Sequence, residues 1–290
     1  MIRIATRNSA LAKAQAGQVA ALLGGAELIE VSSDGEVGDK ARFVRGVERA
    51  LLAREAEIGV HSAKDLPAEM PEGLVIAAVP VREDPADVWI GTGGSLDDVS
   101  EGARVGTASL RRRAQLLAAR PDLEVSELHG NVDTRLRKLG EEELDGVVLA
   151  AAGLNRLGRE GEVSFTLPAG AMVPAAGQGA LVLQARGSDA DSIAAAAEIG
   201  DEMALRELTA ERAVVALLGA TCATPIGVHA QVDGGGLTIE AFVGLPDGSE
   251  WIRDRVEGEA EEPAAAGALL AERLLSAGAR DILDRVEEMA

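Results

Sequence analysis

The sequence predicts an α/β protein built from two doubly wound domains, followed by a small α+β domain. Short apolar strands alternate with helices in two successive segments before residue 186, and this β-α-β rhythm is typical of mostly parallel sheets. After residue 227, apolar and polar residues alternate in short runs, which indicates an antiparallel meander. We expect domain 1 to comprise residues 1–84 and 178–200, domain 2 residues 85–177, and the C-terminal domain residues 201–290.

The composition is that of a soluble globular protein. The 290 residues are enough for two or three domains, and 47% of them are hydrophobic while 26% are charged. Aromatic residues make up only 2%, so the cores must be built from Ala, Val, Leu and Ile. The net charge of −20 argues against nucleic acid or an anionic membrane surface as a partner.

Cysteine and histidine usage limits the metal and redox chemistry. The single cysteine, Cys222, excludes an internal disulfide framework and a cysteine-based metal cluster. The three histidines, at positions 61, 129 and 229, are widely separated, so we expect no metal site. We find neither a signal-like N-terminal segment nor an apolar run long enough to span a membrane, and we therefore expect a cytoplasmic protein.

The first domain opens with a strand at 2–5 and a helix at 10–23. Asn8 or Ser9 is a suitable N-cap for this helix. Arg7 then lies just outside the positive end of the helix, which favours a carboxylate or phosphate ligand. The other expected elements are a strand at 27–32, a polar loop at 33–40, a helix at 43–54 and strands at 57–60 and 74–81.

The second domain repeats one pattern, in which a strand is followed by a polar turn and then by a helix with arginine near its start. The first such helix carries Arg111–Arg113, the second carries Arg135, and Arg156 follows the third strand. The expected elements are a linker at 82–85, a strand at 103–105, a helix ending before Pro121, a strand at 123–128, a helix around 135–138 and a strand at 145–150. Two facing units of this kind would line an anion-binding cleft with guanidinium groups.

The segment 168–179, rich in Gly, Pro and Ala, is interpreted as a return crossing between domains. Gly177 and Gly179 would serve there as hinge or close-approach residues, or as plain turn residues. The elements expected after it are a strand at 181–185, helices at 189–199 and 203–217, strands at 228–233, 237–243 and 251–256, and helices at 262–276 and 279–288.

The polar stretch His61–Pro67 is the strongest candidate for a reactive site. It follows the apolar run 58–60, and open α/β sheets carry their chemistry where buried strands end. Asp65 could hold N–H donors and stabilise a positive charge that develops on a bound ring, with Lys64 beside it. Alternatively, Asp65 caps a turn or pairs with a nearby base.

The triplet Arg111–Arg113 has two interpretations. Neighbouring residues on a helix do not lie on one face, so we expect one of them, Arg113, to be solvated, and the triplet alone could be an exposed helix start. Basic residues in a first turn oppose the helix dipole, however, which indicates that something anionic compensates them. Together with Arg7, Arg135 and Arg156, they favour a cleft for a multiply carboxylated ligand.

Cys222 lies in a loop at 219–227 that is rich in Gly, Thr and Pro, which leaves a covalent role open. A lone cysteine is more often a small buried apolar residue. A catalytic pair with His61 or His229 has no support from the spacing. We expect His229 to be structural and His61 to be a hydrogen-bonding residue of the core or of a loop.

Motifs along most of the chain resemble the porphobilinogen deaminase (hydroxymethylbilane synthase) family in the family's order. They are IATRNSALAKAQA (4–16), FVRGVERALL (43–52), VHSAKDLP (60–67), REDPADVWI (82–90), GTASLRRRAQL (106–116), GNVDTRLRKL (130–139), AAGLNRLG (151–158), PAAGQGAL (174–181), LTAERAVV (208–215) and GATCATPIGVHA (219–230). Beyond residue 230 the resemblance is one of general character.

The resemblance implies two domains folded like periplasmic binding proteins, and a third domain that carries a dipyrromethane cofactor through a thioether to Cys222. It implies a transferase of tetrapyrrole (porphyrin, heme) biosynthesis that deaminates four porphobilinogen molecules and joins them head to tail, after which water releases hydroxymethylbilane. The implied partners are porphobilinogen and the growing oligopyrrole chain, without nucleic acid or membrane, and a monomer is expected.

Carried over residue by residue, the resemblance assigns catalysis to Asp65 and Lys64. The implied cofactor-binding residues are Ser9, Lys64, Asp65, Thr107, Ser109, Arg111, Arg112, Arg135 and Gln178, with Cys222 as the attachment point. The implied substrate-binding residues are Arg7, Gln15, Arg156 and His129.

Two positions depart from the family pattern. The family usually has arginine before Gly130, and His129 stands there in this chain. A neutral imidazole binds carboxylate more weakly, so elongation should fall above the histidine pKa. The loop 33–40 is shorter and more acidic than the common pattern, and Lys40 is its clear basic match.

Two other functions stay open. One is a non-catalytic two-domain binding protein for a polycarboxylate ligand, which needs neither a covalent adduct nor Cys222. The other is a thiol hydrolase, which alkylation of Cys222 would inactivate without any pyrrole chemistry.

Overall fold

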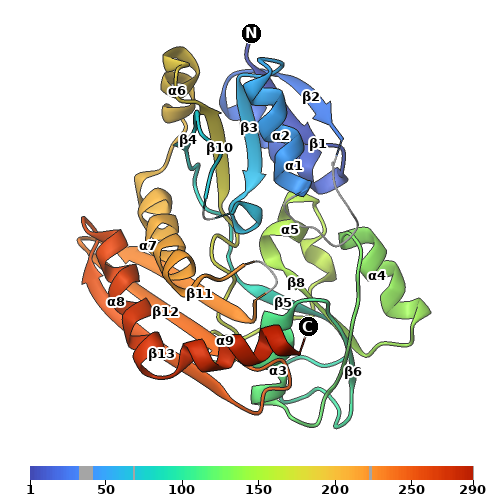
Figure 1. Ribbon diagram of the computed structural model, residues 1–290. Helices are drawn as coiled ribbons and strands as arrows, with labels where there is room; N and C mark the ends of the chain where they lie inside the picture. The colour runs from blue at the N-terminus through green and yellow to red at the C-terminus, as the bar shows by residue number, and fades with distance from the viewer. Residues whose placement is uncertain (33–41, 68, 222–223, 290) are drawn as a thin grey trace. The chain divides into compact units, whose positions relative to one another are not determined.

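The computed structural model describes residues 1–32, 42–67, 69–221 and 224–289. The chain divides into two compact units (Figure 1). Unit 1 comprises Met1–Glu83 and Gly177–Leu208, and unit 2 comprises Asp84–Ala176 and Thr209–Ala290. The separation of a second domain from a C-terminal domain stays a prediction.

Unit 1 is a five-stranded sheet with the strand order β2-β1-β3-β10-β4. Its strands are β1 (Arg3–Arg7), β2 (Glu27–Val31), β3 (Ile58–Ser62), β4 (Leu74–Ala78) and β10 (Leu181–Arg186). Its helices are α1 (Ala10–Leu22), α2 (Arg42–Leu52), α6 (Ala190–Ala197) and the first part of α7 (Glu202–Leu218), with a 3-10 turn η1 (Ala63–Asp65) directly after β3.

Helices cover both faces of this sheet, because alternate residues of each strand point to opposite sides. On one face Ile4 and Leu183 pack with Val19 of α1. On the other face Ala5 packs with Val47 of α2. The prediction of a doubly wound domain is therefore confirmed for unit 1.

Unit 2 begins with a second five-stranded sheet, of strand order β7-β6-β8-β5-β9. Its strands are β5 (Asp87–Gly91), β6 (Arg104–Gly106), β7 (Glu124–Ser126), β8 (Gly146–Ala150) and β9 (Phe165–Thr166). Its helices are α3 (Leu110–Ala119), α4 (Val132–Glu141) and α5 (Ala151–Arg156), and a 3-10 turn η2 lies at Glu160–Glu162. Leu116 of α3 packs on Trp89 on one face, and Leu154 of α5 packs on Val147 on the other, so this sheet is doubly wound too.

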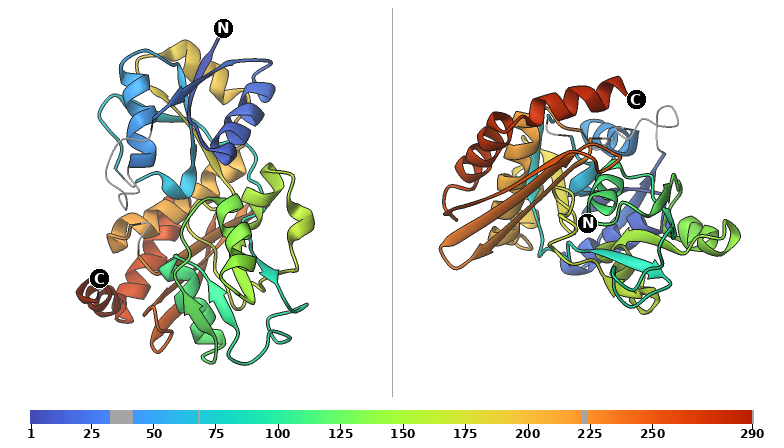
Figure 2. Two further views of the ribbon diagram at one scale, coloured as in Figure 1. Left: turned by 90° about the vertical axis from the view of Figure 1, so that its right-hand side faces the viewer. Right: turned by 90° about the horizontal axis from the view of Figure 1, so that it is seen from below.

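The C-terminal part of unit 2 is the predicted antiparallel meander with helices, and this prediction is confirmed. The strands β11 (Ile226–Asp233), β12 (Gly236–Gly244) and β13 (Trp251–Glu259) pair in chain order. The helices α8 (Pro263–Ser276) and α9 (Ala279–Glu288) join the end of α7 in one apolar core with these strands (Figure 2). On the other face, Phe242 of β12 packs on Ala114 of α3.

The sheets are less parallel than predicted. In unit 1 β1 runs parallel to β2 and β3, but β10 runs antiparallel to β3 and β4. In unit 2 β5 likewise runs antiparallel to β8 and β9. Both β5 and β10 begin just after the chain passes from one unit into the other, so neither comes from a β-α-β crossover that would impose a parallel direction. The strands β5 and β9 were not among the predicted elements.

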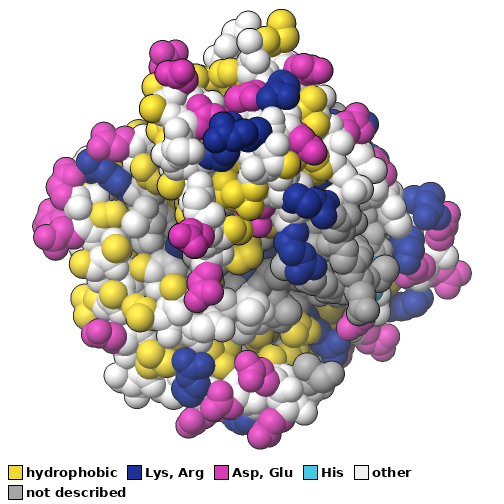
Figure 3. Space-filling model, turned by 45° about the horizontal axis from the view of Figure 1, so that its top comes forward, with side chains coloured by type: hydrophobic (Ala, Val, Ile, Leu, Met, Phe, Trp, Pro, Cys, Tyr) yellow, Lys and Arg dark blue, Asp and Glu magenta, His cyan; other side chains and the backbone are white. Residues whose placement is uncertain are grey.

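No helix in the described part of the chain is long and apolar enough to cross a membrane. The face shown in Figure 3 carries Lys and Arg side chains among Asp and Glu side chains. The net charge of −20 is therefore not a field of one sign over this face, and local arginine clusters can act against it.

Candidate active site

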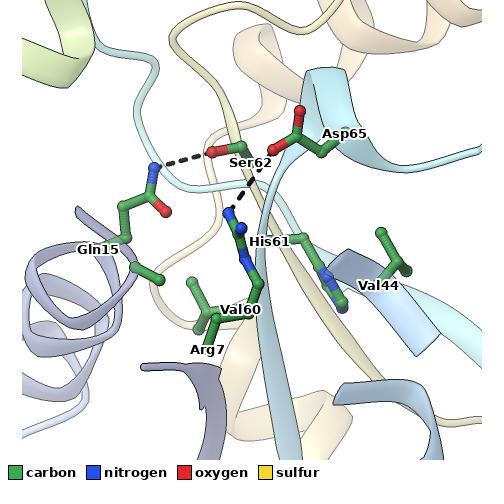
Figure 4. A pocket seen from close by; sticks show the side chains of 8 residues that line it. Arg7, Gln15, Val44, Val60, His61, Ser62 and Asp65 are labelled. Atoms are coloured by element: carbon green, nitrogen blue, oxygen red, sulfur yellow. Dashed lines mark hydrogen bonds and ion pairs between the residues drawn. The ribbon is translucent and has the colours of Figure 1, made fainter. Parts of the chain in front are cut away.

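In unit 1 the predicted catalytic aspartate lies beside two predicted ligand-binding residues. Arg7 ends β1, Gln15 lies on α1 and Asp65 ends η1, and all three line one pocket (Figure 4). The Arg7 Nη2 atom is 3.8 Å from Asp65 Oδ2, and Gln15 Nε2 donates to Ser62 Oγ over 2.8 Å. The Arg7 and Asp65 side chains remain 22% and 28% exposed. Both charged groups can therefore still reach a bound molecule.

The pocket itself is small. Its volume of about 10 Å³ is about the room that one water molecule needs. Its polar lining comes from Arg7 at the end of β1, from Gln15 on α1, and from His61, Ser62 and Asp65 at the end of β3 and in η1. The carboxyl ends of parallel strands are where an α/β sheet places its ligand-binding loops. The Arg7–Asp65 ion pair is long enough for a ligand group to compete for either partner.

Lys64 and Gln178 also meet in unit 1. The Lys64 Nζ atom is 3.4 Å from Gln178 Oε1, and the Gln178 side chain is buried. Gly177 adopts φ +73°, and a Cβ atom there would lie 2.9 Å from the main-chain nitrogen of Lys64 and 2.8 Å from the Cβ of Ala63. Only glycine permits this approach, so Gly177 is a close-approach residue and not simply a turn residue.

Ser9 has a local structural task. It is the N-cap of α1, and its side chain accepts a hydrogen bond from the Ala12 N–H over 3.3 Å. This confirms the predicted helix start. The hydroxyl hydrogen is not used by that bond, so Ser9 can still donate to a ligand.

His61 is a buried residue of unit 1, only 5% exposed, and it also lines the pocket of Arg7 and Asp65. Its Nε2 atom is 2.9 Å from Gln184 Oε1, and Gln184 Nε2 donates to Glu48 Oε1 over 3.2 Å. A carboxylate only accepts, so the Gln184 amide must turn its oxygen to His61, and His61 Nε2 then carries the proton. Burial, together with the charge of Arg7, lowers the pKa of His61 to about 4. Figure 4 shows the His61 ring pointing toward Val44 and away from the Arg7–Asp65 pair.

In unit 2, Arg111 and Arg112 are both bound by one carboxylate of the protein. Asp87, at the start of β5, is 1% exposed, and the two arginines are 4% and 5% exposed. Arg111 Nη1 lies 2.7 Å from Asp87 Oδ2, and Arg112 Nη2 lies 2.7 Å from Asp87 Oδ1. The two guanidinium groups also donate to the Val173 and Val148 carbonyl oxygens, each over 2.8 Å.

The alternative of an exposed helix start is therefore wrong for Arg111 and Arg112. The anion that compensates these two charges includes Asp87, a residue of the protein itself. Burial holds the pKa of Arg112 below its ordinary value, against the opposing pull of Asp87. Arg113 is half-buried and not simply solvated as predicted, and its buried Nε has no hydrogen-bond partner in the described part of the chain.

Arg135 is different, because no carboxylate pairs with it among the described residues. Its half-buried guanidinium has a buried Nε without a hydrogen-bond partner among them. Burial and the charge of Arg112 lower the pKa of Arg135 to about 10. This is a desolvated cation that an acidic ligand group would stabilise.

The other predicted residues of unit 2 have varied settings. Ser109 caps α3 and accepts from the Arg112 N–H over 3.4 Å, while Thr107 Oγ1 accepts from the Ser109 N–H over 3.2 Å. Arg156 follows strand β8, as predicted, and is the last residue of the short helix α5, which was not predicted. His129 is exposed, and its Nε2 lies 3.0 Å from Glu127 Oε2.

Cys222 and the loop 33–40 lie outside the described residues, so the predictions made for them are not tested. The elements on either side of the cysteine loop are described. Glu211 of α7 is fully buried and accepts from the Ala230 N–H of β11 over 2.8 Å. Its Oε1 atom is 3.4 Å from His229 Nδ1, which agrees with the structural role expected for that histidine.

Sequence reasoning missed two buried polar groups that shape these sites. Asp87 was quoted only as part of a motif, although an acidic residue at the start of an apolar run (DVWI) is a signal of a buried partner for a cation. Gln184 stands in the fully buried strand β10 (LVLQAR), and a polar residue in such a strand needs a hydrogen-bond partner. No signal in the sequence identified which residue that partner is.

The fold and these sites define a class of protein: an α/β protein whose strand ends carry guanidinium and carboxylate groups suited to an organic acid. Comparison with known families makes the assignment specific. The family model "Porphobilinogen deaminase, dipyromethane cofactor binding domain" matches residues 2–194, and "Porphobilinogen deaminase, C-terminal domain" matches residues 205–276. The chain belongs to the porphobilinogen deaminase family. The predicted family, the transferase activity and the dipyrromethane cofactor are thereby confirmed.

Curated relatives agree over almost the whole length. The porphobilinogen deaminase of Syntrophus aciditrophicus is 44% identical, over 99% of this chain and 99% of its own. That of Brevibacillus brevis is 41% identical, over 98% of this chain and 97% of its own.

Among solved structures, a TRAP periplasmic solute binding protein from Desulfovibrio salexigens is 10% identical with a TM-score of 0.42, covering 70% of this chain and 73% of its own. A putative periplasmic sulfonate-binding protein from Methylobacillus flagellatus is 14% identical with a TM-score of 0.39, covering 68% and 67%.

The buried Asp87 carboxylate should be essential for the stability of unit 2. We expect Asp87→Asn to lower the free energy of unfolding by about 3–5 kcal/mol, because it leaves two guanidinium groups buried without their counter-charge. Urea unfolding measures this. As a control, Glu141→Gln removes the exposed ion pair with Arg137 one helical turn away and should cost less than about 0.5 kcal/mol. Equal losses in the two variants would contradict the account.

The buried His61 should make stability depend on pH. Its pKa in the fold, about 4, lies below the ordinary 6.5, so the unfolded chain binds more protons and stability falls as the pH drops from 6.5 toward 4. Between pH 7 and pH 5 this group should cost about 2 kcal/mol. Urea unfolding of wild type and of His61→Gln at both pH values measures the difference. The variant should lose correspondingly less stability on acidification, and an identical loss would show that His61 titrates normally.

Proposed function

We propose that this chain synthesises hydroxymethylbilane from four porphobilinogen molecules, with Asp65 as the catalytic carboxylate and the arginines of both units as ligands for acetate and propionate arms. Family membership supports the reaction. The observation that carries the assignment of roles is that Asp65 lines one pocket with Arg7 and Gln15, as their roles require. We further propose that the protein acts as a monomer in the cytoplasm.

In each unit by itself, the described residues supply groups that suit the acidic arms of a dipyrromethane. Arg135 offers a half-buried guanidinium that lacks a carboxylate partner in the described part of the chain, and Lys64 offers an ammonium beside the buried Gln178. Ser109 and Thr107 supply hydroxyl groups near the start of α3. The proposed holding residues are Ser9, Lys64, Asp65, Thr107, Ser109, Arg111, Arg112, Arg135 and Gln178, with Cys222 as the attachment point. When bound, the dipyrromethane supplies the pyrrole carbon on which the chain grows.

For Arg111 and Arg112 this role has a geometric limit. Their contacts with Asp87 and with main-chain carbonyls occupy much of each guanidinium group. Each group has five N–H donors, so some remain for a ligand. We therefore propose that these two residues mainly hold the start of α3 in place, and that Arg135 carries more of the electrostatic attraction for an acidic arm.

Asp65 is proposed to stabilise positive charge on the substrate. Loss of ammonia from porphobilinogen leaves a cation that is spread over the pyrrole ring and its N–H. A carboxylate held in place accepts a hydrogen bond from that N–H and lowers the energy of the charged state. Arg7, 3.8 Å away, keeps the carboxylate oriented and is proposed to bind an acidic arm of the incoming substrate together with Gln15. Lys64 is proposed to assist from the same turn, while Arg156 and His129 are proposed substrate ligands in unit 2.

The proposed function is tested by one pair of measurements on purified protein. Intact mass should show an excess of two linked pyrrole units in wild type and none in Cys222→Ala. Asp65→Asn should keep the excess and the fold but lose turnover about 10²–10⁴-fold or more, because an amide cannot balance the cationic charge.

A matched control is Asp201→Asn, also in unit 1. Asp201 Oδ1 accepts from the Ala204 N–H at the start of α7, and asparagine caps a helix equally well, so turnover should stay near wild type. Turnover by Asp65→Asn at the wild-type rate would refute the catalytic role. Absence of any adduct would favour the non-catalytic binding protein, and alkylation of Cys222 that abolishes a hydrolase activity without an adduct would favour the thiol enzyme.

A further inference from the structure

We propose that Arg82, together with Glu207, is a positioning residue that holds the catalytic turn η1 in place through Gln178. The inference rests on the proposed function, because that function gives Lys64 and Asp65 of this turn their roles. All the contacts involved lie within unit 1.

Arg82 binds a main-chain carbonyl and a carboxylate with one guanidinium group. Its Nε donates to the Gln178 carbonyl oxygen over 2.9 Å, and its Nη1 lies 3.3 Å from Glu207 Oε2. The two side chains are only 7% and 15% exposed. One residue further along, the Glu83 N–H donates to the Gly179 carbonyl over 3.2 Å. The segment 82–83 is thus tied to the segment 178–179, at the two places where the chain leaves and re-enters unit 1.

The segment that Arg82 holds lies directly against the catalytic turn. Gln178 Oε1 is 3.4 Å from Lys64 Nζ, and the Ala63 N–H donates to the Ala180 carbonyl over 3.0 Å. Gly177 lies so close to η1 that a Cβ atom on it would be 2.9 Å from the main-chain nitrogen of Lys64. The residues 177–180 therefore touch η1 through both main chain and side chain, and a shift of Gln178 must shift Lys64.

The chemistry of Arg82 suits this task. A guanidinium is planar and rigid, so one group can fix a carbonyl and a carboxylate in a set relative position, which a lysine cannot do. Burial makes the contacts insensitive to salt. Glu207 lies on α7, the helix that leads to the loop carrying Cys222, so the same ion pair fixes the start of that helix to the segment against η1. A small displacement of catalytic groups is enough to lower turnover strongly.

The test is a double-mutant cycle with Arg82→Gln and Gln178→Leu, read as kcat and KM for porphobilinogen. We expect each single variant to lower kcat about 10-fold with KM within about twofold, as expected for misplaced catalytic groups. Arg82→Gln removes the hydrogen bond to the Gln178 main-chain carbonyl, and Gln178→Leu removes the side-chain contact with Lys64, so both variants interrupt one path from Arg82 to η1. The kcat of the double variant should therefore lie within about threefold of the kcat of the more impaired single variant. Intact mass verifies that each variant still carries its adduct, and Glu207→Gln should give a smaller loss, since the Arg82 Nε contact remains.

Arg186→Gln is the matched control for a merely structural effect. Arg186, also in unit 1, is similarly buried and donates to the Leu51 and Ala56 carbonyls and to Asp189. Its loss should lower the melting temperature without lowering kcat per folded molecule. If Arg82→Gln behaves like Arg186→Gln, or if the two single losses multiply in the double variant, the positioning role is overturned. If wild type makes no hydroxymethylbilane, the proposed function itself fails, and the positioning role fails with it.

Discussion

One buried carboxylate, Asp87, determines how the arginines of unit 2 can be used. It neutralises Arg111 and Arg112 at the start of α3, where both charges would otherwise oppose the helix dipole in a desolvated position. Their guanidinium groups also bind the Val148 and Val173 carbonyls, and so they join β8 and the segment after β9 to the helix. With these two cations compensated from within, Arg135 is left as a desolvated positive charge with no carboxylate partner in the described part of the chain.

In unit 1 the charged groups of the site are more exposed than the Asp87 cluster of unit 2. Asp65 faces Arg7 at 3.8 Å and both remain partly exposed, so the pair is oriented but not locked together. Beneath it, the buried chain of His61, Gln184 and Glu48 is fully hydrogen-bonded along its length, with an uncharged histidine at its end. A buried, hydrogen-bonded layer next to a partly open ion pair favours a preorganised electrostatic site, because the Asp65 carboxylate is then held in place before the substrate acquires its charge.

Much of the fold followed from the sequence because local signals agreed with tertiary structure. The capping residue Ser9 placed the start of α1, and the alternating pattern after residue 227 gave the meander. Strand β5 was not predicted, and the antiparallel direction of β10 was missed, because a run of apolar residues carries no information about strand direction. For the site, motifs located Asp65 and Arg7, whereas the partner of Arg111 and Arg112 came from a residue more than twenty positions away, which no local pattern encodes.

The central claim is that cations left uncompensated by the protein's own carboxylates bind the acidic arms of the substrate. The most direct test compares Arg135→Leu with Arg137→Leu, since Arg137 lies on the same helix but is exposed and paired with Glu141. The measurement is KM for porphobilinogen under steady-state conditions. The account predicts a rise of about 10- to 100-fold for Arg135→Leu, the usual effect of losing a charge-assisted contact, and almost none for Arg137→Leu. An unchanged KM in Arg135→Leu, or equal rises in both variants, would contradict it.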